Sequence, residues 1–136
     1  MEIKKWKRRR YVPTWGGNQE EEDPCVVVFS PPTVGWMISW REIVMEAPMR
    51  AIEAAETEEG APTPAEPLKT WGERVGAFRE EFFRDLILAV ENLTEDGRQM
   101  STEAAVAFID ENEGLREEIF AAMLRAGQVG SASGKD

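Results

Sequence analysis

The chain has 136 residues, 42% of them hydrophobic and 31% charged, which is enough for one domain of ordinary size and too few for two. It contains no histidine and a single cysteine, Cys25. The commonest general base and the commonest metal ligand are therefore missing, and no internal disulfide can form. We expect a protein that is not an enzyme, with no catalytic residues, no metal site and no cofactor.

The net charge of -10 is distributed unevenly along the chain. Residues 1–10 carry six Lys/Arg and one Glu, so the remainder has a net charge of -15. An acidic body repels nucleic acid and keeps a protein dispersed in water. No apolar run approaches the roughly 20 residues that span a bilayer, and the N-terminus lacks the apolar region of a secretory signal. We expect no membrane partner.

Lys4–Arg10 is the only basic cluster in the sequence. Basic residues with an interleaved aromatic, here Trp6, are typical of segments that contact phosphate groups. The acidity of the rest of the chain favours a different interpretation, in which this segment is an arm or an edge strand that pairs with the acidic body.

A turn separates two predicted strands near the N-terminus. Cys25–Phe29 (CVVVF) is rich in β-branched residues and predicts a strand. We expect a β-ribbon whose arms are Ile3–Val12 and Cys25–Ser30, and because two strands are marginal alone, the ribbon must dock on helices or on another subunit. The residues expected to fix the ribbon and its turn against the helices are Tyr11, Pro13, Trp15, Gly17 and Asn18.

A first helix follows the two prolines at 31 and 32. Trp36, Trp40 and Val44 recur at helical spacing, and we expect Pro48 to interrupt the pattern because it cannot donate to the preceding turn. A second short helix over Pro48–Glu58 is predicted after it. Glu59–Pro67 holds three prolines and predicts a semi-extended linker.

Thr70–Leu93 carries the strongest helical pattern in the chain. Thr70 and Glu73 have the spacing of a capping box, and charged residues occupy the side opposite the apolar stripe. A second apolar row widens the stripe and needs cover of its own. The main stripe is Trp71, Val75, Phe78, Phe82, Leu86, Ala89 and Leu93, and the outer row is Phe83, Ile87 and Val90.

Two shorter helices are predicted to close the chain. Thr94–Met100 predicts a loop with an Asp-Gly turn, and Ser101 or Thr102 is expected to cap a helix that ends at about Glu111. Asn112 is expected to cap a last helix, Glu113–Ala126, with Gly127 after its C-terminus.

These elements predict a mainly α protein, a bundle of about four to five helices with a small N-terminal β-ribbon. The expected parts are an N-terminal ribbon plus helix (1–58), a Pro-rich linker (59–69), a C-terminal helical core (70–129) and a disordered tail (130–136).

Two ends of the sequence resemble the tail assembly chaperones of long-tailed (siphovirus-type) bacteriophages. One is the charged opening followed by Tyr11-Val12-Pro13-x-Trp15-x-Gly17-Asn18, an acidic stretch and the run at 26–28. The other is Val90–Leu93, Asp96-Gly97 and the closing helix around Leu115–Ile119. The resemblance covers about 70 residues and leaves Trp36–Pro67 unmatched.

This resemblance implies a non-catalytic protein of the host bacterial cytoplasm that is absent from the mature virion. Such proteins bind and solubilise the long tape measure protein, help recruit tail tube subunits, and can form homo-oligomers. The candidate partner-facing residues are Trp36, Met37, Trp40, Val44, Phe83, Ile87 and Phe120. Two alternatives remain open: a structural tail or head–tail connector component of the virion, and a small nucleic-acid-binding regulator that uses Lys4–Arg10.

Overall fold

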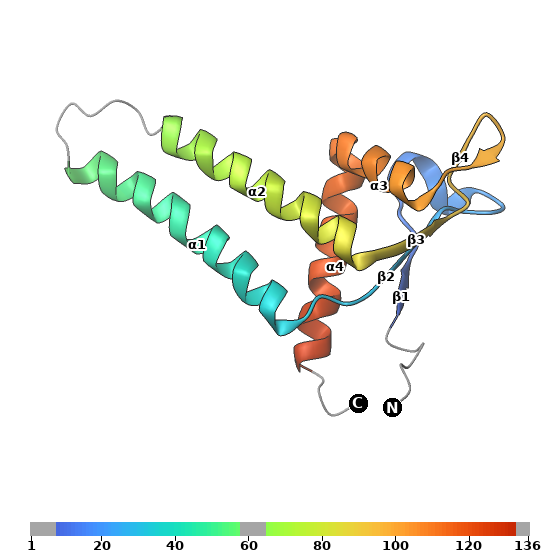
Figure 1. The fold of residues 1–136 in the computed structure, drawn as a ribbon, viewed down its shortest axis with the longest axis horizontal. Helices are drawn as coiled ribbons and strands as arrows, with labels where there is room; N and C mark the ends of the chain where they lie inside the picture. Colours follow the sequence, from blue (N-terminus) through green and yellow to red (C-terminus); the bar gives the residue numbers. More distant parts are fainter. Residues whose placement is uncertain (1–7, 58–64, 133–136) are drawn as a thin grey trace.

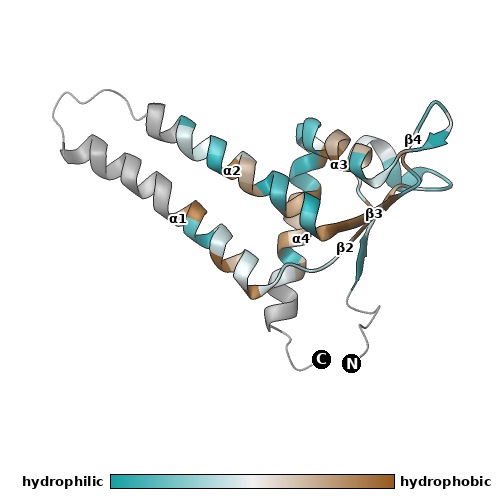
Figure 2. Ribbon diagram, in the orientation of Figure 1, coloured by the Kyte–Doolittle hydropathy of each residue, from teal (hydrophilic) through white to brown (hydrophobic). Residues whose placement is uncertain are grey.

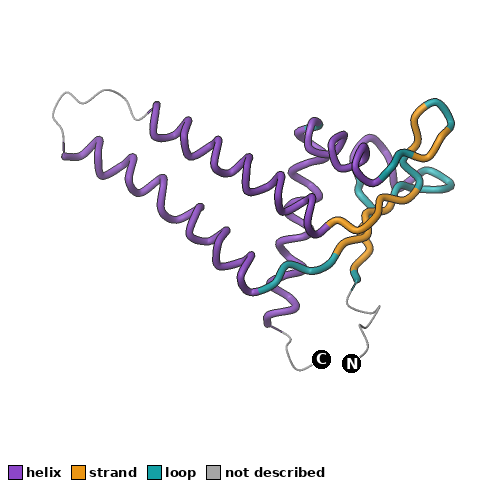
Figure 3. Tube along the Cα trace, viewed as in Figure 1, coloured by secondary structure: helices purple, strands orange, loops and turns teal. Residues whose placement is uncertain are grey.

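Two long helices project from a body made of a small sheet and two further helices (Figure 1). The computed structural model describes the secondary structure of residues 8–57 and 65–132. The burial and contacts of side chains are described for residues 8–45 and 69–127. Helices dominate these residues, as Figure 3 shows, so the prediction of a mainly helical protein is confirmed. In chain order the elements are β1 (Arg9–Tyr11), a 3-10 turn η2 (Trp15–Glu20), β2 (Val26–Phe29), α1 (Val34–Thr57), α2 (Ala65–Leu86), β3 (Ile87–Glu91), β4 (Thr94–Glu95), β5 (Arg98–Gln99), α3 (Thr102–Glu111) and α4 (Glu113–Ala132).

The predicted β-ribbon is present but is part of a larger sheet. β1 pairs antiparallel with β2, with Arg9 opposite Phe29 and Tyr11 opposite Val27. β3 pairs antiparallel with the other edge of β2, with Val27 opposite Val90. The part of the predicted first arm before residue 8 lies outside the described residues. The fold is therefore not a pure helical bundle, and a three-stranded sheet forms part of its core.

The prediction of one helix over Thr70–Leu93 is wrong at both ends. The helix ends at Leu86, and Ile87–Glu91 is a strand. All four residues of β2 are buried, so the backbone groups on both edges of β2 need partners inside the protein. The apolar run that begins at Ile87 supplies the second partner, and this tertiary pairing overrides a helical spacing that the sequence equally allows.

At its other end this helix starts earlier than predicted. α2 begins at Ala65, so Thr70 and Glu73 lie inside it and do not form a capping box. Pro67 stands in the first turn, where a missing N–H breaks no helical hydrogen bond. Residues 65–69 of the predicted linker are therefore helical, and residues 58–64 lie outside the described part of the chain.

Pro48 does not interrupt the first helix as predicted. α1 runs without a break from Val34 to Thr57. Residues on both sides of Pro48 are good helix formers, and α1 packs along α2. The indole N–H of Trp71 on α2 donates to the carbonyl of Ile43, in the turn before Pro48, at 2.7 Å. The carbonyl that Pro48 leaves without a helical donor is that of Val44, one residue further on, so the Trp71 bond does not replace it. Packing against α2 offsets what the proline removes.

The last two helices begin as predicted, and α4 ends later. The Ser101 side chain accepts a hydrogen bond from the N–H of Ala104, so Ser101 caps α3. Asn112 uses its side chain differently, donating to the Phe108 carbonyl at 2.7 Å. α4 continues to Ala132, which places Gly127 inside the helix and makes residues 130–132 helical. Residues 133–136 of the predicted disordered tail lie outside the described residues.

A single hydrophobic cluster draws on both halves of the sequence. Val27 and Phe29 of β2, Ile43 of α1 and Phe82 of α2 belong to it together with residues of α3 and α4. The segments expected to form separate N- and C-terminal parts thus share one core. The Asp-Gly turn is present between β4 and β5, with φ of 51° at Asp96 and 76° at Gly97.

Candidate partner-binding surface

The apolar residues of α1 extend around the helix beyond the side that packs against the rest of the protein. Ile43 is buried against the core, and Trp36 and Trp40 are half-buried. On the neighbouring side of the helix, Val34, Ile38 and Met45 are exposed by 63%, 50% and 58%. With Arg41 they recur at spacings of four, three and four residues, which places them in one row. We call these four residues the α1 outer stripe.

Exposed apolar side chains concentrate on this helix. Of the six large hydrophobic residues exposed within the described side chains, four belong to α1: Val34, Ile38, Val44 and Met45. Figure 2 shows hydrophobic positions spaced along the first half of α1, and a separate group of them in the sheet. Singly scattered apolar residues are normal on a protein surface, but a row of them on one helix is typical of an interaction site.

A groove adjoins the N-terminal end of the outer stripe. It has a volume of about 460 Å³ and lies between the first turns of α1 and Gly127 of α4. Side chains at the start of α1 lie against the backbone of α4 here: a Cβ on Gly127 would lie 2.6 Å from Pro32 Cγ and 2.8 Å from Met37 Sδ. Gly127 therefore serves close packing between α1 and α4. The predicted role of Gly127 at the helix end is wrong.

The predicted residues Trp36 and Trp40 hold α1 against the core. The Trp36 ring packs edge-on against Phe78 and Phe82, with centroids 5.3 and 5.5 Å apart. The Trp40 ring lies 5.0 Å from that of Phe120. Through these contacts both rings anchor α1 to the core. Met37 is half-buried and lines the groove, and Val44 is 37% exposed beside the outer stripe.

Three other residues predicted to face a partner are buried in this fold. Phe83, Ile87 and Phe120 are exposed by 0%, 5% and 5%. Phe83 and Ile87 belong to different elements, α2 and β3, so the helical row that they were expected to form does not exist. All three belong to the hydrophobic cluster. They therefore do not form the exposed row that was predicted.

The N-terminal motif is organised by an acidic residue from the other end of the chain. Glu118 of α4 accepts hydrogen bonds from the Tyr11 hydroxyl at 2.6 Å, from the N–H of Thr14 at 2.6 Å and its hydroxyl at 3.0 Å, and from the N–H of Trp15 at 3.1 Å. Burial acts to raise the pKa of Glu118, but these hydrogen bonds outweigh it and hold that pKa below its usual range. The sequence shows Glu118 only as one of many carboxylates, on the flank of the apolar stripe beside Ile119.

Asn18 closes the turn between β1 and β2. Its amide donates to the carbonyls of Pro13 and Cys25, at 2.8 and 3.0 Å, and its side-chain oxygen accepts from the N–H of Cys25 at 2.8 Å. Pro13 is fully buried, and Gly17 has a φ of 75°, which glycine adopts without strain. Trp15 is 42% exposed, with its ring edge-on to Phe108. These contacts are those expected of residues that fix the ribbon.

One member of the basic cluster pairs with the acidic body. The Arg10 guanidinium donates to both carboxylate oxygens of Glu91, at 2.6 and 3.0 Å, across the sheet. The hydrogen bond from Arg10 lowers the pKa of Glu91. Arg10 thus behaves as the edge-strand interpretation predicts, while Lys4–Lys7 lie outside the described residues.

In residues 8–57 and 65–132, no group of three or more cysteine and acidic side chains is arranged to hold a metal ion. Burial, and to a lesser extent Glu21, raises the pKa of the Cys25 thiol, so the thiol is protonated at neutral pH and is a weak nucleophile.

None of the helices in the described ranges combines the length and hydropathy of a bilayer-crossing segment. Comparisons of the chain with known protein families, with curated proteins and with solved structures gave no significant match.

Proposed function

We propose that this protein is a tail assembly chaperone of a long-tailed bacteriophage, which binds the tape measure protein and helps to recruit tail tube subunits around it. The observation that carries the proposal is the α1 outer stripe, in which three exposed apolar side chains and Arg41 line one side of a helix that aromatic contacts anchor to the core. The resemblance of the two sequence ends to this class supplies the identity of the client.

The chemistry of the outer stripe suits a helical client. A row of apolar side chains at helical spacing packs well against the apolar face of another helix. Met45, with Met37 in the adjoining groove, is unbranched and adapts to partners of different shape. A long client offers many similar apolar faces, so an adaptable surface of modest affinity serves better than one shaped for a single sequence.

The charge of the protein supports the same role. The net charge of -10 repels other copies of the complex and keeps a coated client dispersed. In this proposal the protein acts in the host cytoplasm, forms homo-oligomers where it coats the client, and leaves before the virion is complete. It needs no cofactor and performs no catalysis.

The direct test is co-expression with the tape measure protein of the same phage. Wild-type protein is expected to keep the client soluble and to co-purify with it. The double variant Ile38→Glu/Met45→Glu introduces charge into the outer stripe at exposed positions and is expected to lose most of the captured client. Ser39→Glu, on an exposed position outside the stripe, is the matched control and is expected to retain it.

Mass spectrometry of purified virions separates this proposal from a structural role. A chaperone is expected to be missing from mature particles, whereas a tail or connector subunit is present in fixed stoichiometry. The nucleic-acid alternative requires binding that weakens steeply with salt and depends on Lys4–Arg10. Soluble client in the absence of this protein, or full capture by the double variant, would refute the chaperone proposal.

A further inference from the structure

A second groove lies between α2 and α3, away from the groove at the start of α1. Its volume is about 780 Å³. Phe83, Ile87 and Val106 contribute an apolar floor, and Thr102, Ala107 and Glu111 belong to the α3 wall. This groove shares no residue with the α1 outer stripe or with the groove beside it.

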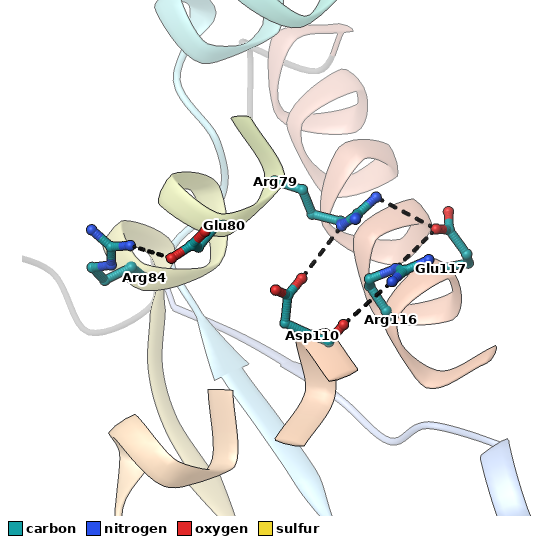
Figure 4. A network of polar contacts seen from close by, with 6 residues as sticks. All are labelled: Arg79, Glu80, Arg84, Asp110, Arg116 and Glu117. Carbon is teal, nitrogen blue, oxygen red and sulfur yellow. Dashed lines mark hydrogen bonds and ion pairs between the residues drawn. The ribbon is translucent and has the colours of Figure 1, made fainter. Parts of the chain in front are cut away.

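The rim of this groove is acidic. Four carboxylates and one guanidinium line it: Glu80, Glu103, Asp110, Glu111 and Arg84. Figure 4 shows how some of these charges are already used: Arg84 pairs with Glu80 at 2.9 Å, and Asp110 pairs with Arg79 at 3.5 Å. Glu103 and Glu111 are exposed, and among the described residues neither has an ion-pair partner.

The two remaining carboxylates stand at opposite ends of one wall. Glu103 lies in the first turn of α3 and Glu111 at its last residue. Eight residues of α-helix separate them by about 12 Å. Val106 and Ala107 lie between them on the same wall. The groove therefore presents an apolar centre with an unpaired negative charge at each end.

We propose that the α2–α3 groove binds a cationic amphipathic helix of a partner protein, with an apolar face on Val106 and Ala107 and Lys or Arg side chains reaching Glu103 and Glu111. A helix lying in a groove is a common mode of recognition, read through anchors at helical spacing. Charge complementarity selects the occupant. A neutral helix leaves the two carboxylates without ion-pair partners, and an acidic helix is repelled by them.

Two synthetic peptides of about four helical turns test the proposal on the full chain. Both carry leucine at i, i+3, i+4 and i+7; one has lysine and the other glutamate at the remaining positions. Calorimetry is expected to show binding of the lysine peptide alone. Glu103→Gln/Glu111→Gln is expected to weaken that binding roughly three- to tenfold, as two exposed ion pairs allow. Ala107→Arg, which fills and charges the groove from an exposed position, is expected to abolish it.

Four comparisons make the result decisive. Glu22→Gln/Asp23→Asn removes the same charge from an exposed loop outside the groove and is expected to leave binding unchanged; an equal loss in this variant means non-specific attraction and overturns the proposal. Undiminished binding to Ala107→Arg also overturns it. Sedimentation provides a further test. If the wild-type protein self-associates and Ala107→Arg abolishes this association, a second copy of the chain occupies the groove, and the proposal is overturned. Ile38→Glu/Met45→Glu is expected to bind the peptide normally, which separates this site from the proposed client surface.

Discussion

The hydroxyl of Tyr11 donates a hydrogen bond of 2.6 Å to Glu118, a residue 107 positions further along the chain. Tyr11 ends the first strand of the sheet, and Glu118 lies on the last helix. The same carboxylate also accepts the backbone N–H groups of Thr14 and Trp15. One side chain thus fastens the N-terminal ribbon to the last helix of the chain.

The first prediction concerns the titration of Tyr11. Burial, and then the hydrogen bond to Glu118, raises the pKa of this phenol to about 12 from an ordinary value of 10.0. Because Tyr11 is the only tyrosine in the chain, tyrosinate absorbance follows this group alone. The midpoint is expected near pH 12, and Glu118→Gln is expected to lower it while burial keeps it above the ordinary value.

The same shift makes stability depend on alkaline pH. A raised pKa in the folded state stabilises the fold fully below the unfolded pKa of about 10, and this stabilisation is lost as pH rises towards the folded value. Urea unfolding between pH 9 and 12 measures the loss, with circular dichroism to verify that the protein is folded. An ordinary midpoint near 10 in the folded protein would contradict the burial of Tyr11.

The second prediction is that Glu118→Gln destabilises the protein. A neutral amide loses the charge-assisted hydrogen bonds and brings an N–H group towards the same donors, so the free energy of unfolding at pH 7 is expected to fall by about 1–2 kcal/mol. Because the folded pKa of Glu118 is lowered, its contribution is present above the ordinary glutamate pKa of about 4.3 and is lost as pH falls below it. The difference between variant and wild type should therefore shrink in acid.

Its neighbour provides the control. Glu117 is 55% exposed and pairs with Arg79 and Arg116 at 3.6 and 3.2 Å. Exposed ion pairs contribute little, so Glu117→Gln is expected to change the free energy of unfolding by less than about 0.5 kcal/mol. Equal effects of the two substitutions in urea titrations would mean that Glu118 has no special role.

Local signals in the sequence predicted local structure well. The β-branched run at Val26–Phe29, the cap at Ser101 and the Asp-Gly turn at 96–97 each follow from the conformational preferences of a few neighbouring residues. All three are present. In each case the physical cause lies within a handful of positions, which a single sequence displays.

The predictions that failed concern segments whose structure depends on contacts with distant parts of the chain. Ile87–Glu91 fits a helical stripe as well as a strand, and the choice depends on the free edge of β2, some sixty positions earlier. Phe83 and Ile87 looked like members of one outer row because that choice was unknown. Phe120 lies on a second face of its own helix, and the sequence does not show that the core covers this face. Met37 and Val44, predicted as candidates from the sequence, lie beside the proposed outer stripe. The outer stripe and the acidic groove require knowing which faces the fold covers.

The third prediction concerns the contact of α4 with the start of α1. Gly127→Ala places a methyl group within 2.6 Å of Pro32 Cγ and 2.8 Å of Met37 Sδ. The Met37 side chain can turn away, but the rigid ring of Pro32 cannot, so the Pro32 segment or α4 must move. The expected loss is about 1–3 kcal/mol of unfolding free energy, although alanine is intrinsically the better helix former. Gly76→Ala on α2 is the matched control, because its nearest neighbour is the end of Arg79 at 4.0 Å, and it is expected to stabilise by roughly 0.5–1 kcal/mol. Stabilisation by both substitutions would rule out the close approach.

The fourth prediction tests what joins the two long helices. The indole N–H of Trp71 on α2 donates to the Ile43 carbonyl of α1 at 2.7 Å, and Trp71→Phe removes this donor while keeping an aromatic ring. The expected loss is about 1 kcal/mol, measured by urea unfolding followed by circular dichroism. Trp15→Phe makes the same chemical change at a ring whose N–H has no hydrogen-bond partner recorded among the described residues, and a smaller effect is expected. If the two variants lose equal stability, ring size and not the hydrogen bond accounts for the effect.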